Sequence, residues 1–227
     1  MNIFRHLPNA LTCANLATGC IGIRFAINGE LHYAAYTAWL SCVFDFFDGF
    51  AARMLNVSSP IGKELDSLAD VVSFGVLPAL VMFSLIEKVT EIPWLPYFAL
   101  LIAIFSALRL AKFNLDERQT VGFIGLPTPA NALFFTSLIF LPAPLDWVRG
   151  NPAALITLAV LFSLLLVAPL PLFALKFKNW SWSENWLKFT FVLIAVLLIA
   201  WQQAAALPLI ILLYIGASFI VSRFSSP

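Results

Sequence analysis

Apolar residues form eight long runs along this chain, and turn-forming residues mark most of the breaks between them. The runs cover roughly residues 9–28, 32–54, 66–87, 94–113, 128–147, 153–174, 187–203 and 206–222. An α-helix needs about 20 mostly apolar residues to cross the hydrocarbon core of a bilayer. Breaks such as Asn28-Gly29 and Gly150-Asn151-Pro152 are typical of loops. The pattern therefore predicts an all-α integral membrane protein with about eight transmembrane helices.

The composition supports the same class of protein. Of 227 residues, 61% are apolar and 11% are charged, whereas soluble domains have about 45–50% and 25%. The hydrophobic core of a soluble domain of this length could not bury so many apolar residues. We expect one polytopic membrane domain over residues 1–227, and the composition excludes a collagen, a disulfide scaffold, a disordered tail and a nucleic-acid binder. The net charge is only +1, so the positions of individual charges carry the information.

Lys and Arg residues are divided unevenly between the two ends of the predicted helices. Three of the thirteen, Arg24, Lys88 and Arg149, fall at one end, and ten fall at the other. Those ten are Arg5, Arg53, Lys63, Arg109, Lys112, Arg118, Lys176, Lys178, Lys188 and Arg223. Because positive charge favours the cytoplasmic side, we expect both termini in the cytoplasm and an even number of spans. Eight satisfies this condition, and six with two misassigned helices would also satisfy it.

The cysteines and the N-terminal segment add little chemistry. Cys13, Cys20 and Cys42 lie in apolar runs without metal-ligand or disulfide spacing, so we expect small buried side chains. Residues 1–8 are short and polar, and no convincing cleavage site follows the first apolar run. We therefore expect this run to remain as the first span. His6, far in sequence from the acidic residues described below, is expected at the membrane interface.

Four aspartates lie where the second apolar run ends and the third begins. Asp45 and Asp48 are three residues apart, and Asp66 and Asp70 are four apart. Each pair should therefore project from one face of its own helix. The short link over residues 56–61 would fold these helices antiparallel and bring both pairs together on the cytoplasmic side. Carboxylates at this depth in a membrane protein are costly and usually mark a functional site.

Four clustered carboxylates repel one another unless cations neutralise them. Arg53 and Lys63 are the only cationic residues nearby in sequence. Since neither Cys nor His joins the group, the pattern favours Mg²⁺ or Mn²⁺ over zinc as the cation. Helix capping by acids that face the headgroup region is the structural alternative, and the paired spacing disfavours it.

A patch of small residues lies next to these acids. Gly49, Ala51 and Ala52 leave the second helix without large side chains directly after Asp48. A flat ring or a sugar could lie against such a backbone. Close packing of two helices is the alternative role for the small residues.

The whole run has a defined spacing. It reads Asp45-x2-Asp48-Gly49-x2-Ala52-Arg53-x8-Gly62-x3-Asp66-x3-Asp70, with eight fixed residues in twenty-six positions. At every defined position it resembles the signature of the CDP-alcohol phosphatidyltransferase family. The resemblance implies a membrane enzyme that displaces CMP from a CDP-linked lipid with two divalent metal ions.

The resemblance also implies roles for individual residues. The four aspartates would hold the two metal ions, and Asp70 would be the general base. The nucleotide would be framed by Gly49, Ala52, Arg53 and Gly62. The family further implies a core of six helices, here with two more, and a homodimer.

Other stretches extend the match. Leu65–Val76, Arg109–Asn114 and Phe123–Ala130 are similar to the phosphatidylserine synthase branch of the family, and Pro8–Thr12 matches the first helix of the wider family. The last match adds Asn9 and Thr12 to the expected nucleotide site. The resemblance covers about residues 8–130, the expected catalytic core, and the later helices agree only in hydropathy.

The branch implies transfer of the phosphatidyl group of CDP-diacylglycerol to the hydroxyl of L-serine. A serine pocket must bind a carboxylate and an ammonium group. Arg109 is the better candidate for the carboxylate because its planar fork can bind both oxygens, and Asn114 could orient the amine or the lipid phosphate. Lys112 stands where the branch usually has Arg, so it keeps the charge but loses the fork. Simple anchoring at the cytoplasmic interface is the alternative for Arg109 and Lys112.

Two rival functions remain open from the sequence. Another enzyme of the same family would use glycerol 3-phosphate or inositol phosphate, and Arg109, Lys112 and Arg118 could form the basic cluster that such an acceptor requires. A divalent-cation transporter would use the carboxylates as an ion path, but it should also carry acids near the bilayer midplane and in the far half.

Overall fold

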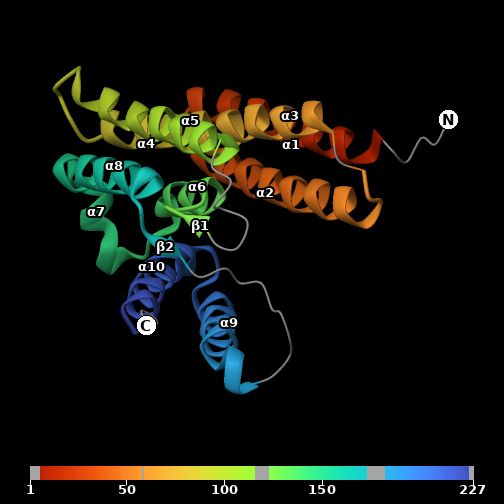
Figure 1. The fold of residues 1–227 in the computed structure, drawn as a ribbon. Coiled ribbons are helices and arrows are strands. Elements are labelled where there is room, and N and C mark those ends of the chain that lie inside the picture. The colour runs from red at the N-terminus through yellow and green to blue at the C-terminus, as the bar shows by residue number, and fades with distance from the viewer. Residues whose placement is uncertain (1–5, 58, 116–122, 173–181, 225–227) are drawn as a thin grey trace.

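The computed structural model describes residues 6–57, 59–115, 123–172 and 182–224, and these residues form an almost entirely helical protein (Figure 1). The α-helices are α1 (Leu7–Ile27), α2 (Leu31–Met54), α3 (Pro60–Asp70), α4 (Leu77–Glu87), α5 (Leu100–Leu115), α6 (Thr128–Ser137), α7 (Asp146–Gly150), α8 (Pro152–Val167), α9 (Trp182–Gln202) and α10 (Leu207–Phe224). Short helical turns are η2 (Val71–Val76), η3 (Leu95–Ala99), η5 (Leu138–Phe140), η6 (Ala143–Leu145) and η7 (Gln203–Ala206). One antiparallel pair joins strands β1 (Phe123–Ile124) and β2 (Pro171–Leu172).

Several helices can cross a membrane by length and composition. They are Leu7–Ile27, Pro60–Glu87, Leu95–Leu115 and Asn185–Phe219. The bent pair Thr128–Phe140 and Ala143–Gly150 is a fifth candidate if it is counted as one span. Within the described part of the chain, these four or five helices support a helical membrane protein. Eight spans and cytoplasmic termini stay predictions.

The first five α-helices form one side of the molecule, with α6 and α8 below them and α9 and α10 furthest away (Figure 1). Helix α1 packs along α2 and also contacts α3, η2 and α4. Gly19 allows α1 to approach η2 closely, because a Cβ atom at this position would lie 2.3 Å from Ser73 Oγ and 3.0 Å from Ser73 Cα. Small residues at helix crossings are a common packing device in membrane proteins.

Helices α3 and α4 are continuous through η2, a six-residue π-helical turn that begins directly after Asp70. The helix starts at Pro60, where we had expected the span to start near residue 66. Ser59 explains the earlier start, since its hydroxyl accepts a hydrogen bond from Gly62 N (3.1 Å) and Pro60 occupies the first turn. π-Helical turns of this kind are often found at functional sites.

The predicted span over 128–147 is broken into two helical segments in the structure. The helical path ends at Phe140, and the next helical segment is bent from it by 109°. Pro142 and Pro144 follow directly, and proline supplies no amide hydrogen for a continuing helix. The predicted span 153–174 is also too long, because α8 ends at Val167 before Pro169 and Pro171.

The last two predicted helices are present as α9 and α10. Between them Gln203 has a left-handed backbone (φ 52°), which separates the two helices at η7. Helix α10 contacts α6 and β2, which joins the C-terminal part of the chain to the helices of the expected core.

Candidate active site

The two pairs of aspartates lie together, as their spacing predicts. Carboxylate oxygens of Asp45, Asp48 and Asp66 all lie within 4.8 Å of one another. The carboxyl group of Asp45 also lies against that of Asp70. Helix α2 supplies the first pair and helix α3 the second. The fold therefore gathers all four acids at the junction of α2 and α3.

Helix α1 contributes a hydroxyl group to this cluster. Thr12 Oγ1 donates a hydrogen bond to Asp48 Oδ2 at 2.7 Å, and both side chains are buried. The same hydroxyl lies 3.1 Å from the carbonyl oxygen of Pro8. Thr12 therefore orients Asp48. From the sequence, Thr12 was expected only at the nucleotide site.

Asp70 is the last residue of α3 and is also buried. Its Oδ1 accepts a hydrogen bond from Asn15 Nδ2 at 3.3 Å. Asn15 is completely buried on α1. This residue was missed from the sequence. Its signal was a polar amide six residues after Asn9 in a mostly apolar helix.

The cluster has the donor set of a hard divalent cation. Asp66 Oδ1 is buried and has no hydrogen-bond partner among the described residues. Nor does any Lys or Arg of the described part form a salt bridge with the four acids. Lys63 Nζ donates instead to the carbonyl oxygen of Asn114 at 3.1 Å. Carboxylate oxygens that form no salt bridge among the described residues fit Mg²⁺ or Mn²⁺.

A cavity of about 580 Å³ opens beside the acids, within the range of small-molecule sites. Its wall comes from α1, the end of α2, the following link and the start of α3. The wall includes five residues expected at the nucleotide site, namely Asn9, Thr12, Gly49, Ala52 and Gly62, together with the acids Asp48 and Asp66. Pro8, Asn56, Val57, Ser59, Ile61, Lys63 and His6 complete it.

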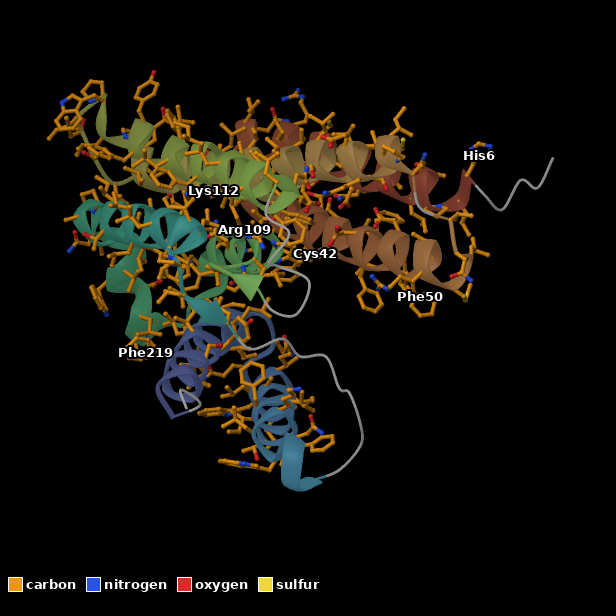
Figure 2. The ribbon with its side chains drawn as sticks, viewed as in Figure 1. His6, Cys42, Phe50, Arg109, Lys112 and Phe219 are labelled. Carbon is orange, nitrogen blue, oxygen red and sulfur yellow. The ribbon has the colours of Figure 1, made fainter. Side chains whose placement is uncertain are left out.

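His6 lines the same cavity as Asp48 and Asp66, although it is far from them in sequence (Figure 2 labels it at the start of α1). This is possible because α1 runs antiparallel to α2 and returns its first turn to the end of α2. The expected place of His6 at the membrane interface stays a prediction.

The expected glycines have defined neighbours. A Cβ atom at Gly62 would lie 3.0 Å from Asn9 Oδ1 and 3.1 Å from Ser59 Oγ, so the glycine lets α3 approach α1. A Cβ atom at Gly49 would meet the guanidinium of Arg53 at 3.4 Å. Arg53 itself is not among the residues that line the cavity. It lies one helical turn after Gly49, with its guanidinium next to that glycine.

The three residues expected to bind serine lie in different surroundings on α5. Arg109 is 7% exposed, interacts electrostatically with Asp70, and donates weakly to Thr128 Oγ1 at 3.4 Å (Figure 2). Lys112 is exposed. Asn114 Nδ2 donates to Ser67 Oγ at 2.8 Å, so it joins α5 to α3. Arg118 of the rival basic cluster lies outside the described residues. Among Arg109, Lys112 and Asn114, Arg109 is the residue with a described interaction with one of the four acids.

Comparisons with known proteins identify the family of this chain. The chain matches the family described as CDP-alcohol phosphatidyltransferase over residues 5–201. It is 35% identical over 144 residues to the CDP-diacylglycerol–serine O-phosphatidyltransferase of Bacillus subtilis, covering 62% of this chain and 78% of the relative. The Helicobacter pylori (strain 26695) protein of the same name is 32% identical over 213 residues, or 92% of this chain and 87% of the relative.

An archaeal relative with the same name, from Methanocaldococcus jannaschii, is 38% identical over 127 residues. That match covers 56% of this chain and 57% of the relative. Four acids on two antiparallel helices beside a cavity are what the family signature predicted, and the family match spans most of the chain. The chain belongs to the CDP-alcohol phosphatidyltransferase family.

Proposed function

We propose that this membrane enzyme transfers the phosphatidyl group of CDP-diacylglycerol to the hydroxyl of L-serine and releases CMP. The observation that carries the proposal is the acidic cluster of Asp45, Asp48, Asp66 and Asp70 beside a cavity large enough for a nucleotide. The names of the relatives support serine as the acceptor.

The cavity suits the cytidine nucleotide end of the lipid. Gly49 and Ala52 present a surface of α2 without large side chains, against which a ring or sugar can lie. Asn9 and Thr12 offer polar groups from α1, and Gly62 keeps α3 close to α1. Arg53, whose guanidinium lies next to Gly49, adds positive charge near the pyrophosphate.

The reaction forms a bond between the serine oxygen and the phosphorus that bears diacylglycerol, and it breaks the bond from that phosphorus to the oxygen of CMP. Asp70 accepts the proton of the serine hydroxyl as the new bond forms, because a carboxylate is too weak a base to remove it beforehand. Asn15 holds Asp70 through its amide nitrogen.

The four aspartates would hold two divalent cations, Mg²⁺ or Mn²⁺. When bound, such ions neutralise charge on the phosphate oxygens and stabilise the departing CMP oxygen. The remaining work of the protein is positioning, which is the main requirement of phosphoryl-type transfer.

A panel of acceptors tests the proposal. Purified protein is given CDP-diacylglycerol with Mg²⁺ or Mn²⁺ and one acceptor at a time: L-serine, glycerol 3-phosphate, inositol phosphate or none. CMP release that depends on L-serine is the expected result. Release with glycerol 3-phosphate or inositol phosphate, but not with serine, would assign the enzyme to another branch. CMP release that depends on none of the acceptors would overturn the transferase proposal.

We also propose eight spans in the cytoplasmic membrane, with both termini and the active site on the cytoplasmic side, and a homodimer. The catalytic core would be residues 8–130. The bias of Lys and Arg toward one side of the membrane supports this orientation. The CDP head group and serine are water-soluble, so the active site must be open to the cytoplasm.

A labelling experiment tests the orientation. Cysteines introduced at residues 64 and 91 of an otherwise cysteine-free protein should react with an impermeant reagent from opposite sides of the membrane.

A further inference from the structure

Lys63 lines the nucleotide cavity, and its charge is not neutralised by an acid. It is the fourth residue of α3 and belongs to the cavity wall together with Asp48 and Asp66. Among the residues that the structure describes in this wall, Lys63 is the only Lys or Arg. Its ammonium group forms no salt bridge with either acid. Lys63 therefore brings positive charge to the cavity that is available to an anionic ligand.

The ammonium group of Lys63 bonds instead to a neighbouring helix. Nζ donates a hydrogen bond to the carbonyl oxygen of Asn114, near the end of α5, at 3.1 Å. An ammonium group has three donors, and this bond uses one of them. The bond is exposed to solvent. A phosphate would add charge attraction that the neutral carbonyl oxygen does not offer, so Lys63 can exchange this partner for a phosphate in the cavity.

The position of Lys63 on α3 is unfavourable for a cation without an anionic partner. The first turn of a helix carries partial positive charge, which stabilises acidic side chains and not basic ones. Helix α3 has no acidic residue in its first turn, and Lys63 adds charge of the same sign there. An anion in the cavity would remove this conflict, because the helix and the lysine would then attract the same group.

The proposed reaction creates such an anion. Four ionised aspartates balance the charge of two divalent cations, so the loaded acidic cluster has no net charge to offer. Each phosphate of CDP-diacylglycerol carries one negative charge. The phosphate of CMP gains a second one as the bond to the reacting phosphorus breaks. Groups that stabilise charge developing in the transition state accelerate a reaction, and a cation on the CMP side of the breaking bond would do so here.

We propose that Lys63 binds the phosphate of the CMP moiety and stabilises it as CMP departs. This inference rests on the proposed function. The Nζ atom leaves the carbonyl oxygen of Asn114 and donates to an oxygen of the nucleoside phosphate. Lys63 stays protonated throughout. The electron pair of the breaking phosphorus–oxygen bond remains on the CMP oxygen, and the proton of serine goes to Asp70.

Inhibition by CMP and by cytidine measures this contact in the full-length protein with Mg²⁺, CDP-diacylglycerol and L-serine. In Lys63→Met and Lys63→Gln, we expect the inhibition constant for CMP to rise by about tenfold or more. The constant for cytidine, which lacks the phosphate, should change by less than about twofold. Lys63→Gln is informative because its amide can still donate to the carbonyl oxygen of Asn114. Lys63→Arg keeps the charge and should retain most of the affinity for CMP.

Two control variants separate phosphate binding from other effects. Lys88→Met removes an exposed lysine directly after α4, outside the cavity wall, and should keep both inhibition constants. Ser67→Ala removes the acceptor of a second hydrogen bond between α3 and α5, from Asn114 Nδ2 at 2.8 Å. It should lower Tm but keep the ratio of the two constants, because Lys63 remains in place.

An unchanged inhibition constant for CMP in folded Lys63 variants would overturn the inference and leave the transferase proposal intact. Equal rises for CMP and cytidine would also overturn it, because they would show that Lys63 shapes the cavity and does not bind phosphate. If Lys63→Met does not fold, Lys63→Gln decides the question by the same ratio. Absence of serine-dependent CMP release by the wild-type protein would instead refute the proposed function.

Discussion

Asn15 on α1 donates a hydrogen bond from its side-chain amide to Oδ1 of Asp70 on α3, at 3.3 Å. The backbone carbonyl of Asn15 accepts hydrogen bonds from the hydroxyls of Ser41 (3.2 Å) and Ser73 (3.0 Å). One residue of the first helix is thus connected to α2, to η2 and to the proposed base. The orientation of Asp70 therefore depends on the packing of α1.

Asn15→Ala should lower kcat roughly tenfold, with little change in KM for CDP-diacylglycerol. A hydrogen bond to a charged group contributes about 1.5–3 kcal/mol, and about 1.4 kcal/mol corresponds to a tenfold rate change. CMP release measures the effect. Cys13→Ala on the same helix is the control, because Cys13 is exposed, contrary to the expectation of a buried side chain. A wild-type kcat in Asn15→Ala would show that Asp70 does not need this partner.

Asp70→Asn should reduce turnover by about 10²–10⁴-fold, the usual contribution of a general base. Binding of the lipid nucleotide should persist in part, because Asp70 is not among the residues that line the cavity. Thermal stabilisation by CDP-diacylglycerol measures this binding. Glu64→Gln, an exposed acid on the same helix, should behave as wild type. Full activity in Asp70→Asn would remove Asp70 from the role of base.

Much of the acidic site was predictable because helical spacing alone determines it. Residues three or four apart share a helix face, and a short link brings two such faces together. Asn15 was harder to identify. Its partner, Asp70, lies on another helix, and no fixed spacing in the sequence relates the two residues.

The helix ends illustrate the same difference. Apolar runs located the long helices, but length alone did not reveal that Pro142 and Pro144 would bend the path after α6. The π-helical turn after Asp70 also has no apolar pattern of its own. Its geometry depends on the close contacts of Gly75 with α5 and of Ser73 with α1.

Removal of divalent cations should abolish activity, and Mg²⁺ or Mn²⁺ should restore it. Since Asp45, Asp48 and Asp66 lie within 4.8 Å of one another, their mutual repulsion should also make the metal-free protein less stable. Added cation should therefore raise the Tm of the wild-type protein. Asp66→Asn should stabilise the metal-free protein and weaken the response to cation. A Tm and an activity that do not respond to chelator would contradict the metal site.

Gly19→Ala should lower both Tm and kcat, because the added methyl group would meet Ser73 Oγ at 2.3 Å and Ser73 Cα at 3.0 Å. Overpacking of this kind costs typically about 1–3 kcal/mol. Movement of Ser73 also shifts the η2 turn, and with it Asp70. Gly216→Ala on α10 is the matched control, since nothing lies within 4 Å of its added methyl group and Ala is the better helix former by about 1 kcal/mol. It should keep or raise Tm and leave kcat unchanged. Equal behaviour of the two variants would mean that α1 does not pack against η2 closely enough to position the base.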